Sequence, residues 1–419
     1  MKKHICLKCL LAFLSILFIE GCSKNNSEVL ILWTDNVEFA SYAELFNSSQ
    51  NDVKVAAVYK SDIISSLPVE KGHTNPDICA GSYLSSGISK HYFKRLNGIF
   101  SDKLKPTAFY PGLLNFGKKG GSQYLLPVNF NLGAMVYDIN NSDYVSGTDT
   151  INFDQIKESS SKFNLKNKEN IYSKMGFAPQ WNPDFLYEII TANNISFAYQ
   201  NETIKFNIPQ FEATLDYIKT WTNEINTSFV DEKDFSFKYL YTPYNKQVLQ
   251  QKSLLAYATS DSLLSLSEEQ LDKMDFKWLS VNSKLTALEN ATMIGIYKKS
   301  KNKAACKKFI QWFMTKEAQE MMLKRKIDMN LDTNTFGIAN GFSSLIEVNE
   351  HVFPIYYKCL LAKIPLSTQI KEPHVYPSDW KTIKNDVLYP FVITNLEGKN
   401  EISDFAKNYA EWKNQIKEE

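Results

Sequence analysis

Residues 29–58, VLILWTDNVEFASYAELFNSSQNDVKVAAV, contain the pattern that decides the fold. Val29 to Trp33 is an apolar run with the length of a buried strand, and turn-forming residues follow it directly. Glu38 to Ser48 places apolar side chains at intervals of three and four residues, which is typical of one face of a helix. Val53 to Val58 again favours a strand. The stretch therefore predicts a strand, a helix and a second strand in that order.

The same alternation recurs along the rest of the chain. Helical patterns occur at 209–223 and 301–315, and the stretch from Phe342 to Glu419 is expected to be mostly helical. An alternation of strands and helices is typical of an α/β fold in which crossover helices connect mostly parallel strands. Further strands are expected at 77–80, 124–127, 132–137, 254–258, 276–281 and 292–297.

The first residues resemble a bacterial export signal. Lysines precede a mainly apolar run from Cys9 to Ile19, which is too short to span a membrane as a helix. The following Ile-Glu-Gly-Cys sequence, ending at Cys22, resembles the lipobox of bacterial lipoproteins. We therefore expect residues 1–21 to be a lipoprotein signal peptide, Cys22 to carry the lipid, and residues 22–28 to form a solvated tether. An ordinary signal peptide with an incidental cysteine is the alternative.

Length and composition limit the classes of protein. The 419-residue chain is longer than a single hydrophobic core usually serves, so two domains or lobes are expected. Its 47 Lys and Arg residues nearly balance 46 Asp and Glu residues, which disfavours nucleic acid as a partner. Beyond the signal and Cys22, the cysteines Cys79, Cys306 and Cys359 lie far apart in apolar segments, so one pair bridges or all are buried thiols. The histidines are scattered, and we expect no metal and no cofactor.

A set of short segments carries a resemblance to a known family. In order they are Trp33-Thr34-Asp35, Ala43 to Asn47, Pro76-Asp77-Ile78, Leu126-Pro127, Gly133 to Asp138, Leu254 to Ala258, Ala304 to Thr315 with Glu317-Ala318, and Pro377 to Trp380 with Val387. With these segments the chain resembles the bacterial extracellular solute-binding proteins of the sugar-type ABC importer class, the maltose-binding-protein-like group. No single segment is specific, but together they cover nearly the whole chain after Cys22 in the right order.

The resemblance implies a two-lobed, type II-like periplasmic-binding-protein fold. Each lobe would be a mostly parallel sheet with flanking helices, and the chain would end in a helical tail. Lobe 1 would comprise residues 29–137 and 288–332, and lobe 2 residues 138–287 and 333–419. The ligand would lie in the cleft between the lobes, which would close about a hinge when a solute contacts both of them.

The candidate ligand contacts are residues that follow strands or begin helices, because the crevice of an open parallel sheet lies beyond the carboxyl ends of its strands. We expect ligand contacts from Asp35, Asn36, Ser82, Tyr83, Asn129, Asn131, Trp181, Asn182, Asp261, Tyr376 and Trp380.

Each candidate in the first half of the chain has a purely structural alternative. Asp35 or Asn36 would instead cap the helix that follows, and Tyr83, next to Ser82, would pack on a neighbouring helix. Asn129 and Asn131 flank an aromatic residue in a way that suits a sugar, but two asparagines so placed also suit a turn.

The later candidates are equally open. Trp181 and Asn182 precede a helix, where they would act as a hydrophobic staple and a cap if they do not contact ligand. Asp261 stands where the family often has a tryptophan, so the usual stacking aromatic is missing there. Tyr376 and Trp380 could supply aromatic contacts instead, with burial in the core as the alternative.

The resemblance implies a function in solute capture. We expect a non-enzymatic, lipid-anchored substrate-binding protein of an ABC importer, most simply for a carbohydrate, with the permease subunits as partners. It would be a monomer in the cell envelope, anchored to a membrane and facing the periplasm or the exterior. A lipid-anchored carbohydrate-active hydrolase is one alternative, because carboxylates are plentiful even though familiar nucleophile and metal motifs are missing. A sensor or adhesin of the same fold is another.

Overall fold

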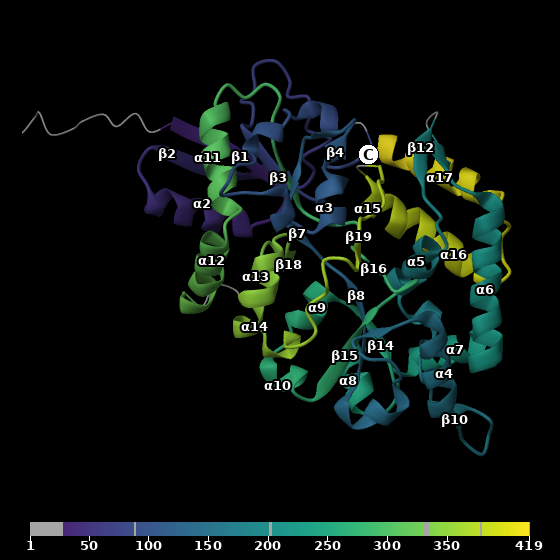
Figure 1. Ribbon diagram of the computed structural model, residues 1–419. Helices are drawn as coiled ribbons and strands as arrows, with labels where there is room; N and C mark the ends of the chain where they lie inside the picture. Colours follow the sequence, from purple (N-terminus) through teal and green to yellow (C-terminus); the bar gives the residue numbers. More distant parts are fainter. Residues whose placement is uncertain (1–27, 88, 201–202, 330–334, 378, 419) are drawn as a thin grey trace, which may run out of the picture.

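The computed structural model describes residues 28–87, 89–200, 203–329, 335–377 and 379–418 (Figure 1). The expected signal peptide at 1–21, the lipid site Cys22 and the tether up to residue 27 lie outside the described residues.

A five-stranded sheet begins with the opening segment of the sequence. β1 (Glu28–Thr34), α2 (Glu38–Ser49) and β2 (Val53–Tyr59) confirm the predicted strand, helix and strand. The strand order is β2-β1-β3-β17-β6, with β3 at Ile78–Gly81, β17 at Met293–Ile296 and β6 at Leu126–Pro127. β1 is parallel to β2 and β3, whereas β17 runs antiparallel to both of its neighbours.

A second sheet has the order β14-β8-β15-β9, with β14 at Ala256–Thr259, β8 at Gly133–Asp138, β15 at Met274–Leu279 and β9 at Thr150–Ile151. β8 is antiparallel to both β14 and β15, and only β15 and β9 pair in parallel. The expectation of a mostly parallel sheet is therefore wrong for the second sheet, and the first sheet has as many antiparallel as parallel pairings. An apolar run shows that a strand is buried but not in which direction it runs, and a buried strand satisfies its backbone equally well in either direction.

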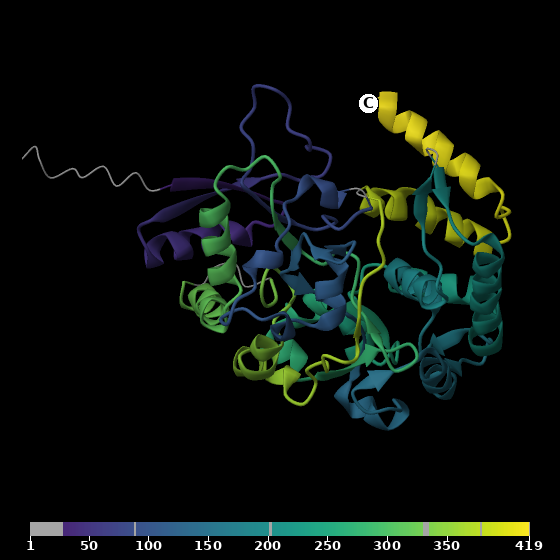
Figure 2. The same ribbon diagram turned by 45° about the horizontal axis from the view of Figure 1, so that its top comes forward.

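Helices cover both sheets (Figures 1 and 2). α2, α11 and α12 lie beside the first sheet, at the left of Figure 1. α5, α6, α16 and α17 lie at the right of the view, on the side of the molecule away from α2, α11 and α12. The longer helices are α2, α4 (Phe153–Phe163), α5 (Pro183–Ala192), α6 (Ile208–Asn226), α7 (Phe229–Lys238), α11 (Lys303–Phe313), α12 (Lys316–Asp328), α16 (Tyr389–Leu396) and α17 (Asp404–Glu418). Shorter ones are α3 (Pro111–Phe116), α8 (Tyr244–Leu249), α9 (Ser260–Leu264), α10 (Glu268–Leu271), α13 (Ile346–His351), α14 (Phe353–Tyr356), α15 (Trp380–Ile383) and the π-helical turn η7 (Lys384–Leu388).

Short ladders complete the fold. Their strands are β4 (Lys118–Lys119) with β5 (Ser122–Gln123), β7 (Asn129–Phe130) with β18 (Phe342–Ser343), β10 (Leu165–Lys166) with β11 (Tyr172–Lys174), β12 (Ala198–Gln200) with β13 (Thr203–Lys205), and β16 (Leu285–Thr286) with β19 (Ile370–Lys371).

The two faces of β8 belong to different hydrophobic cores. Ala134 and Val136 pack in the largest cluster, which also contains the inner face of β1 and much of α11. Met135 and Tyr137 point the other way into a cluster built from α5, α6 and the C-terminal helices. Because the largest cluster draws residues from both expected lobes, the lobe boundaries stay a prediction.

Candidate ligand-binding site

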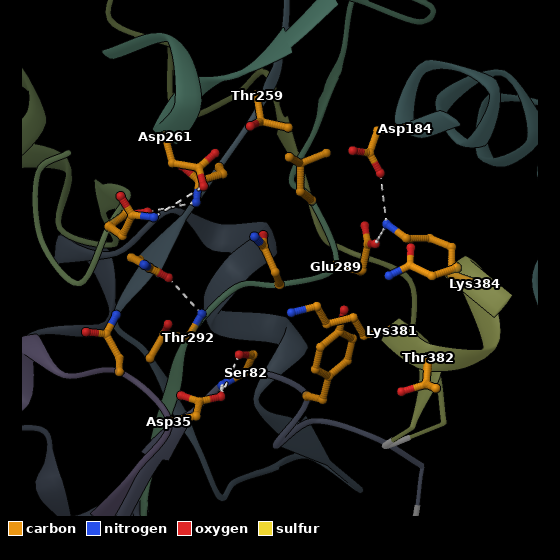
Figure 3. Close-up of a pocket in the computed structure, with 18 of the residues that line it drawn as sticks. Asp35, Ser82, Asp184, Thr259, Asp261, Glu289, Thr292, Lys381, Thr382 and Lys384 are labelled. Atoms are coloured by element: carbon orange, nitrogen blue, oxygen red, sulfur yellow. Dashed lines mark hydrogen bonds and ion pairs between the residues drawn. The ribbon is translucent and has the colours of Figure 1, made fainter. Parts of the chain in front are cut away.

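A cavity of about 660 Å³ lies where the chain crosses between the two sheets (Figure 3). On the first sheet, its walls come from the residues after β1, β2 and β3, and from the segment that leads into β17. On the second sheet, they come from the end of β14, the first turns of α5 and the α15–η7 segment. Strand register explains the meeting point, because Thr34 pairs with Tyr59 and Ala80 at the carboxyl ends of parallel strands.

Asp35 is the first polar side chain after β1 in this wall. Its Oδ2 accepts hydrogen bonds from Ser82 N–H at 2.9 Å and from Ser82 Oγ at 2.7 Å. Burial raises the pKa of Asp35, although these hydrogen bonds oppose the rise. The neighbouring Asn36 Oδ1 accepts the Glu38 N–H at the start of α2, so the helix does not need Asp35 as its cap.

Asparagine side chains hold a turn against the cavity wall. The Nδ2 groups of Asn36 and Asn129 donate to the carbonyl oxygen of Ala339 at 2.9 and 2.6 Å, and Asn131 Nδ2 donates to Asn340 O at 2.9 Å. Ala339 and Asn340 have φ of 51° and 63°, a left-handed conformation that needs such support.

The amide oxygens of the same asparagines also have partners. Asn129 Oδ1 accepts the Thr292 N–H at 2.7 Å, and Asn131 Oδ1 accepts Ser260 Oγ at 2.6 Å. Both asparagines are only 2% exposed. Their amides therefore link the turn, the segment before β17 and the start of α9.

Asp261 enters the cavity from the first turn of α9. Its Oδ2 accepts Asn340 Nδ2 at 3.3 Å. Its Oδ1 is buried and, among the described residues, has no hydrogen-bond partner. A buried carboxylate oxygen without a partner is costly, so a donor that reached this atom would be favoured.

The opposite wall is built around Lys384. Its Nζ lies 3.1 Å from Asp184 Oδ1 and 2.5 Å from Glu289 Oε1 (Figure 3), and Tyr389 donates to the same Asp184 oxygen at 2.7 Å. Burial acts to lower the pKa of Lys384, but the two carboxylates outweigh it and the pKa is raised. Lys384 thus ties η7 to α5 and to the segment that connects the two sheets.

Glu188 lies one turn after Asp184 on α5 and is 8% exposed. Its Oε1 accepts the Tyr257 hydroxyl at 3.2 Å. Burial, reinforced by the negative charge of Glu289, raises the pKa of Glu188 to about 8. At neutral pH its carboxyl group is therefore protonated.

Tyr83 is a half-buried side chain in the cavity lining and has a φ of 57°. Burial and the negative charges of Glu289, Asp184 and Asp35 raise the pKa of its hydroxyl. A bulky residue in the left-handed region is strained, and such strain is often found at functional sites.

A family comparison identifies the class of protein. A family model described as bacterial extracellular solute-binding protein matches residues 41–331, which is more than half of the chain. The chain belongs to this family. No curated protein sequence matches it.

Solved structures share the fold of this solute-binding protein. The ABC substrate-binding protein of Listeria monocytogenes in complex with cycloalternan has 16% identity and a TM-score of 0.58, covering 93% of this chain and 99% of that one. The cyclic α-maltosyl-1,6-maltose binding protein of Arthrobacter globiformis has 15% identity and a TM-score of 0.60, with coverages of 91% and 96%. A family 1 extracellular solute-binding protein of Alicyclobacillus acidocaldarius has 13% identity and a TM-score of 0.61, with coverages of 93% and 98%. At these identities the likeness shows the two-lobed α/β fold.

Most of the ligand contacts expected from the sequence lie in the cavity lining of this solute-binding protein. Ligand contact itself stays a prediction for each of them. They are Asp35, Asn36, Ser82, Tyr83, Asn129, Asn131 and Asp261.

The structure places the remaining expected contacts outside the lining. Trp181 stacks on Phe235 with ring centroids 5.4 Å apart and donates from Nε1 to a backbone carbonyl. Asn182 caps α5 by accepting two backbone N–H groups. Tyr376 and Trp380 stack on each other at 4.6 Å and are 5% and 0% exposed. Asn182 therefore caps a helix, and the three aromatic side chains pack against other aromatic rings.

Sequence reasoning missed the charged half of the cavity. Asp184, Glu188, Glu289, Lys381 and Lys384 all line it, and none was a candidate. The spacing of Asp184 and Glu188 on one helix face, just after the cap Asn182, was the available signal. Glu289 and Lys384 meet only in the folded chain.

Other classes of site are limited by what the described residues contain. In that part of the chain no group of three or more His, Cys, Asp or Glu side chains could hold a metal ion. Cys79 and Cys359 carry free thiols, and Cys306 Sγ lies 3.8 Å from Ser300 Oγ. Between residues 28 and 418, apart from the undescribed gaps, no helix is long and apolar enough to cross a membrane.

Proposed function

We propose that this chain is the substrate-binding protein of an ABC importer and captures a carbohydrate in the cavity between its two sheets. The observation that carries the proposal is a large cavity whose walls come from both sheets and consist mainly of carboxyl, hydroxyl and amide groups. Sugar hydroxyls donate to carboxylates, and the C–H face of a sugar ring packs on an aromatic ring such as that of Tyr83.

The solved structures support the solute class. Several are complexes with sugars, among them cycloalternan, maltose and mannotriose. A ligand that contacts residues of both sheets would favour a closed arrangement, because it gains the contacts from the second sheet only when the cleft closes around it. The lobes would be 29–137 with 288–332 and 138–287 with 333–419, and the protein would act as a monomer.

The proposal includes the membrane anchor. A lipid on Cys22, after removal of residues 1–21, would keep the protein at the membrane surface next to its permease subunits. The short tether at 22–28 would leave the cleft free to open and close. Mass spectrometry of the protein from bacterial membranes tests this part, and an unmodified Cys22 in the exported protein would contradict it.

A thermal-shift screen tests the solute class. The protein from residue 23 onward would be heated with a library of carbohydrates and other small metabolites, because a ligand that binds only the folded state raises the melting temperature. We expect carbohydrates to give the largest shifts and to be recovered unchanged after incubation, as befits a binding protein. Shifts with another class alone would contradict the carbohydrate, and hydrolysis of an oligosaccharide would contradict the binding role.

A further inference from the structure

The cavity holds many more acidic than basic side chains. Lys381 and Lys384 are its only lysines among the described lining residues. The arginines of the chain, Arg95 and Arg325, lie outside the lining, and Arg325 bonds Glu44 on the surface. The acidic lining residues are Asp35, Asp62, Asp184, Glu188, Asp261, Glu289 and Asp379.

Ion pairing and protonation neutralise only some of these acidic side chains. Lys384 bridges Asp184 and Glu289, and its partners keep it charged. Glu188 is protonated at neutral pH because burial raises its pKa to about 8. Asp35, Asp62, Asp261 and Asp379 then remain, with Lys381 as the single further ammonium group in the described lining.

Two of the remaining carboxylates are held by neutral donors. Asp35 accepts from Ser82 N–H and Oγ, and Asp261 accepts from Asn340 Nδ2 while its Oδ1 is buried without a partner in the described structure. Asp35 follows β1 in the first sheet and Asp261 follows β14 in the second. Closure around a neutral molecule would therefore bury negative charge from both walls, which is unfavourable unless a cation accompanies it.

Anions and bare metal ions fit this cavity poorly. A sugar phosphate or sugar acid is usually bound by guanidinium groups, which the described lining does not have, and it would be repelled by the acidic walls. The described residues also contain no cluster that could hold a metal ion. Among charged solutes, an organic cation is therefore the class that fits the cavity.

We propose that the solute is an amino sugar or a short amino-sugar oligomer, with a protonated amine that pairs with Asp261. Asp35, which follows β1 in the first sheet, adds to the attraction for the ammonium group, and the ring hydroxyls bond the remaining polar groups of the lining. This proposal rests on the carbohydrate function proposed above and specifies the chemistry of that carbohydrate.

Calorimetric titration with matched sugars tests the proposal. Glucosamine and its β-1,4-linked dimer would be compared with the N-acetylated sugars and with glucose and cellobiose, at about pH 6, where amines are largely protonated. We expect the amines to bind at least about tenfold more tightly than their acetylated counterparts, since one desolvated ion pair contributes at least that much. The preference should shrink as salt concentration rises.

Two variants test whether the negative charge of Asp261 causes the preference for amines. Asp261→Asn keeps the size of the side chain and an acceptor for Asn340, and it should remove most of the preference for the amine over its acetylated counterpart. Glu212→Gln removes one negative charge from the exposed face of α6, outside the cavity, and should leave the preference unchanged.

The outcomes separate the two proposals. If neutral or acetylated sugars bind as tightly as amines, or if Asp261→Asn keeps the preference, the amino-sugar proposal is wrong and the carbohydrate function stands. If no sugar of either kind binds, or if only simple diamines such as 1,4-diaminobutane bind, both proposals are wrong. A preference for amines that is lost in Asp261→Asn alone supports the amino sugar.

Discussion

Replacement of Glu188 by glutamine should make the protein more stable above neutral pH. Glu188 is 8% exposed, accepts one hydrogen bond from Tyr257, and has its pKa raised from an ordinary value of 4.5 to about 8, mainly by burial. Glutamine keeps the shape of the side chain and an oxygen acceptor for the Tyr257 hydroxyl, but it does not titrate. The variant therefore isolates the effect of one buried carboxyl group.

The direction of this pH effect on stability follows from the number of protons that the folded and unfolded states bind. Between about pH 4.5 and 8, the glutamate ionises in the unfolded chain but stays protonated in the folded protein. The folded state then binds more protons, so the free energy of unfolding falls as the pH rises through this window, and it levels off above pH 8. At 1.36 kcal/mol for each pH unit, the full loss from Glu188 is on the order of 4 to 5 kcal/mol.

Urea denaturation of the wild type and Glu188→Gln at a series of pH values from about 5 to 9 measures this loss. Titrating groups that do not interact with Glu188 cancel in the difference between the two proteins. The variant should gain stability steadily relative to the wild type up to about pH 8 and then run parallel to it. Glu232→Gln is a matched comparison, because burial raises the pKa of Glu232 only to about 7 and its relative gain should end about one pH unit earlier. A difference for Glu188→Gln that does not change with pH would refute the protonated state of this residue.

Other substitutions test packing and the division of roles around the cavity. Lys384→Met should lower the free energy of unfolding by about 3 to 5 kcal/mol, because it leaves two carboxylates without their cation, and a loss below about 1 kcal/mol in urea denaturation would contradict that pairing. Gly176→Ala should cost about 1 to 3 kcal/mol, since its Cβ would lie 2.3 Å from the backbone of α4, whereas Gly87→Ala has open space and should change stability by less than about 0.5 kcal/mol. Equal thermal melting of the two alanine variants would contradict this. Tyr83→Ala should weaken solute binding in calorimetry by about tenfold or more, whereas Trp380→Phe should lower the melting temperature and leave affinity nearly unchanged. The opposite pattern would place the ligand against the aromatic core.

The first strands and helices were predictable because each is long enough to show its own period. β1, α2 and β2 match the expected ranges within a residue or two, and the helix expected at 301–315 is present as α11. The direction of β8 in the second sheet was not predictable. Both of its faces are buried, so its apolar run carries no alternation and no sign of which neighbour it pairs with.

The cavity wall formed by the first sheet was predictable, because the positions of its residues follow from strand order. Asp35 and Ser82 come directly after parallel neighbours, so they meet at one edge of the sheet whatever else the chain does. The opposite wall depends on α5, η7 and the segment before β17 coming together. Lys384 and Glu289 lie far apart in the sequence, and no local pattern marks them as partners.

The asparagines around the cavity show why residue type alone does not assign a ligand contact. Asn129 and Asn131 have the donor and acceptor that suit a sugar, but a buried left-handed turn at 339–340 needs the same groups for its backbone carbonyls. An amide can satisfy a carbonyl and an N–H at once, so it is well suited to hold such a turn. A carboxylate can only accept, so it cannot satisfy the turn's carbonyls, and Asp261 Oδ1 has no hydrogen-bond partner among the described residues. The side chains best suited to hold the cavity wall are thus the neutral amides, and the acids that remain determine which solute the cavity favours.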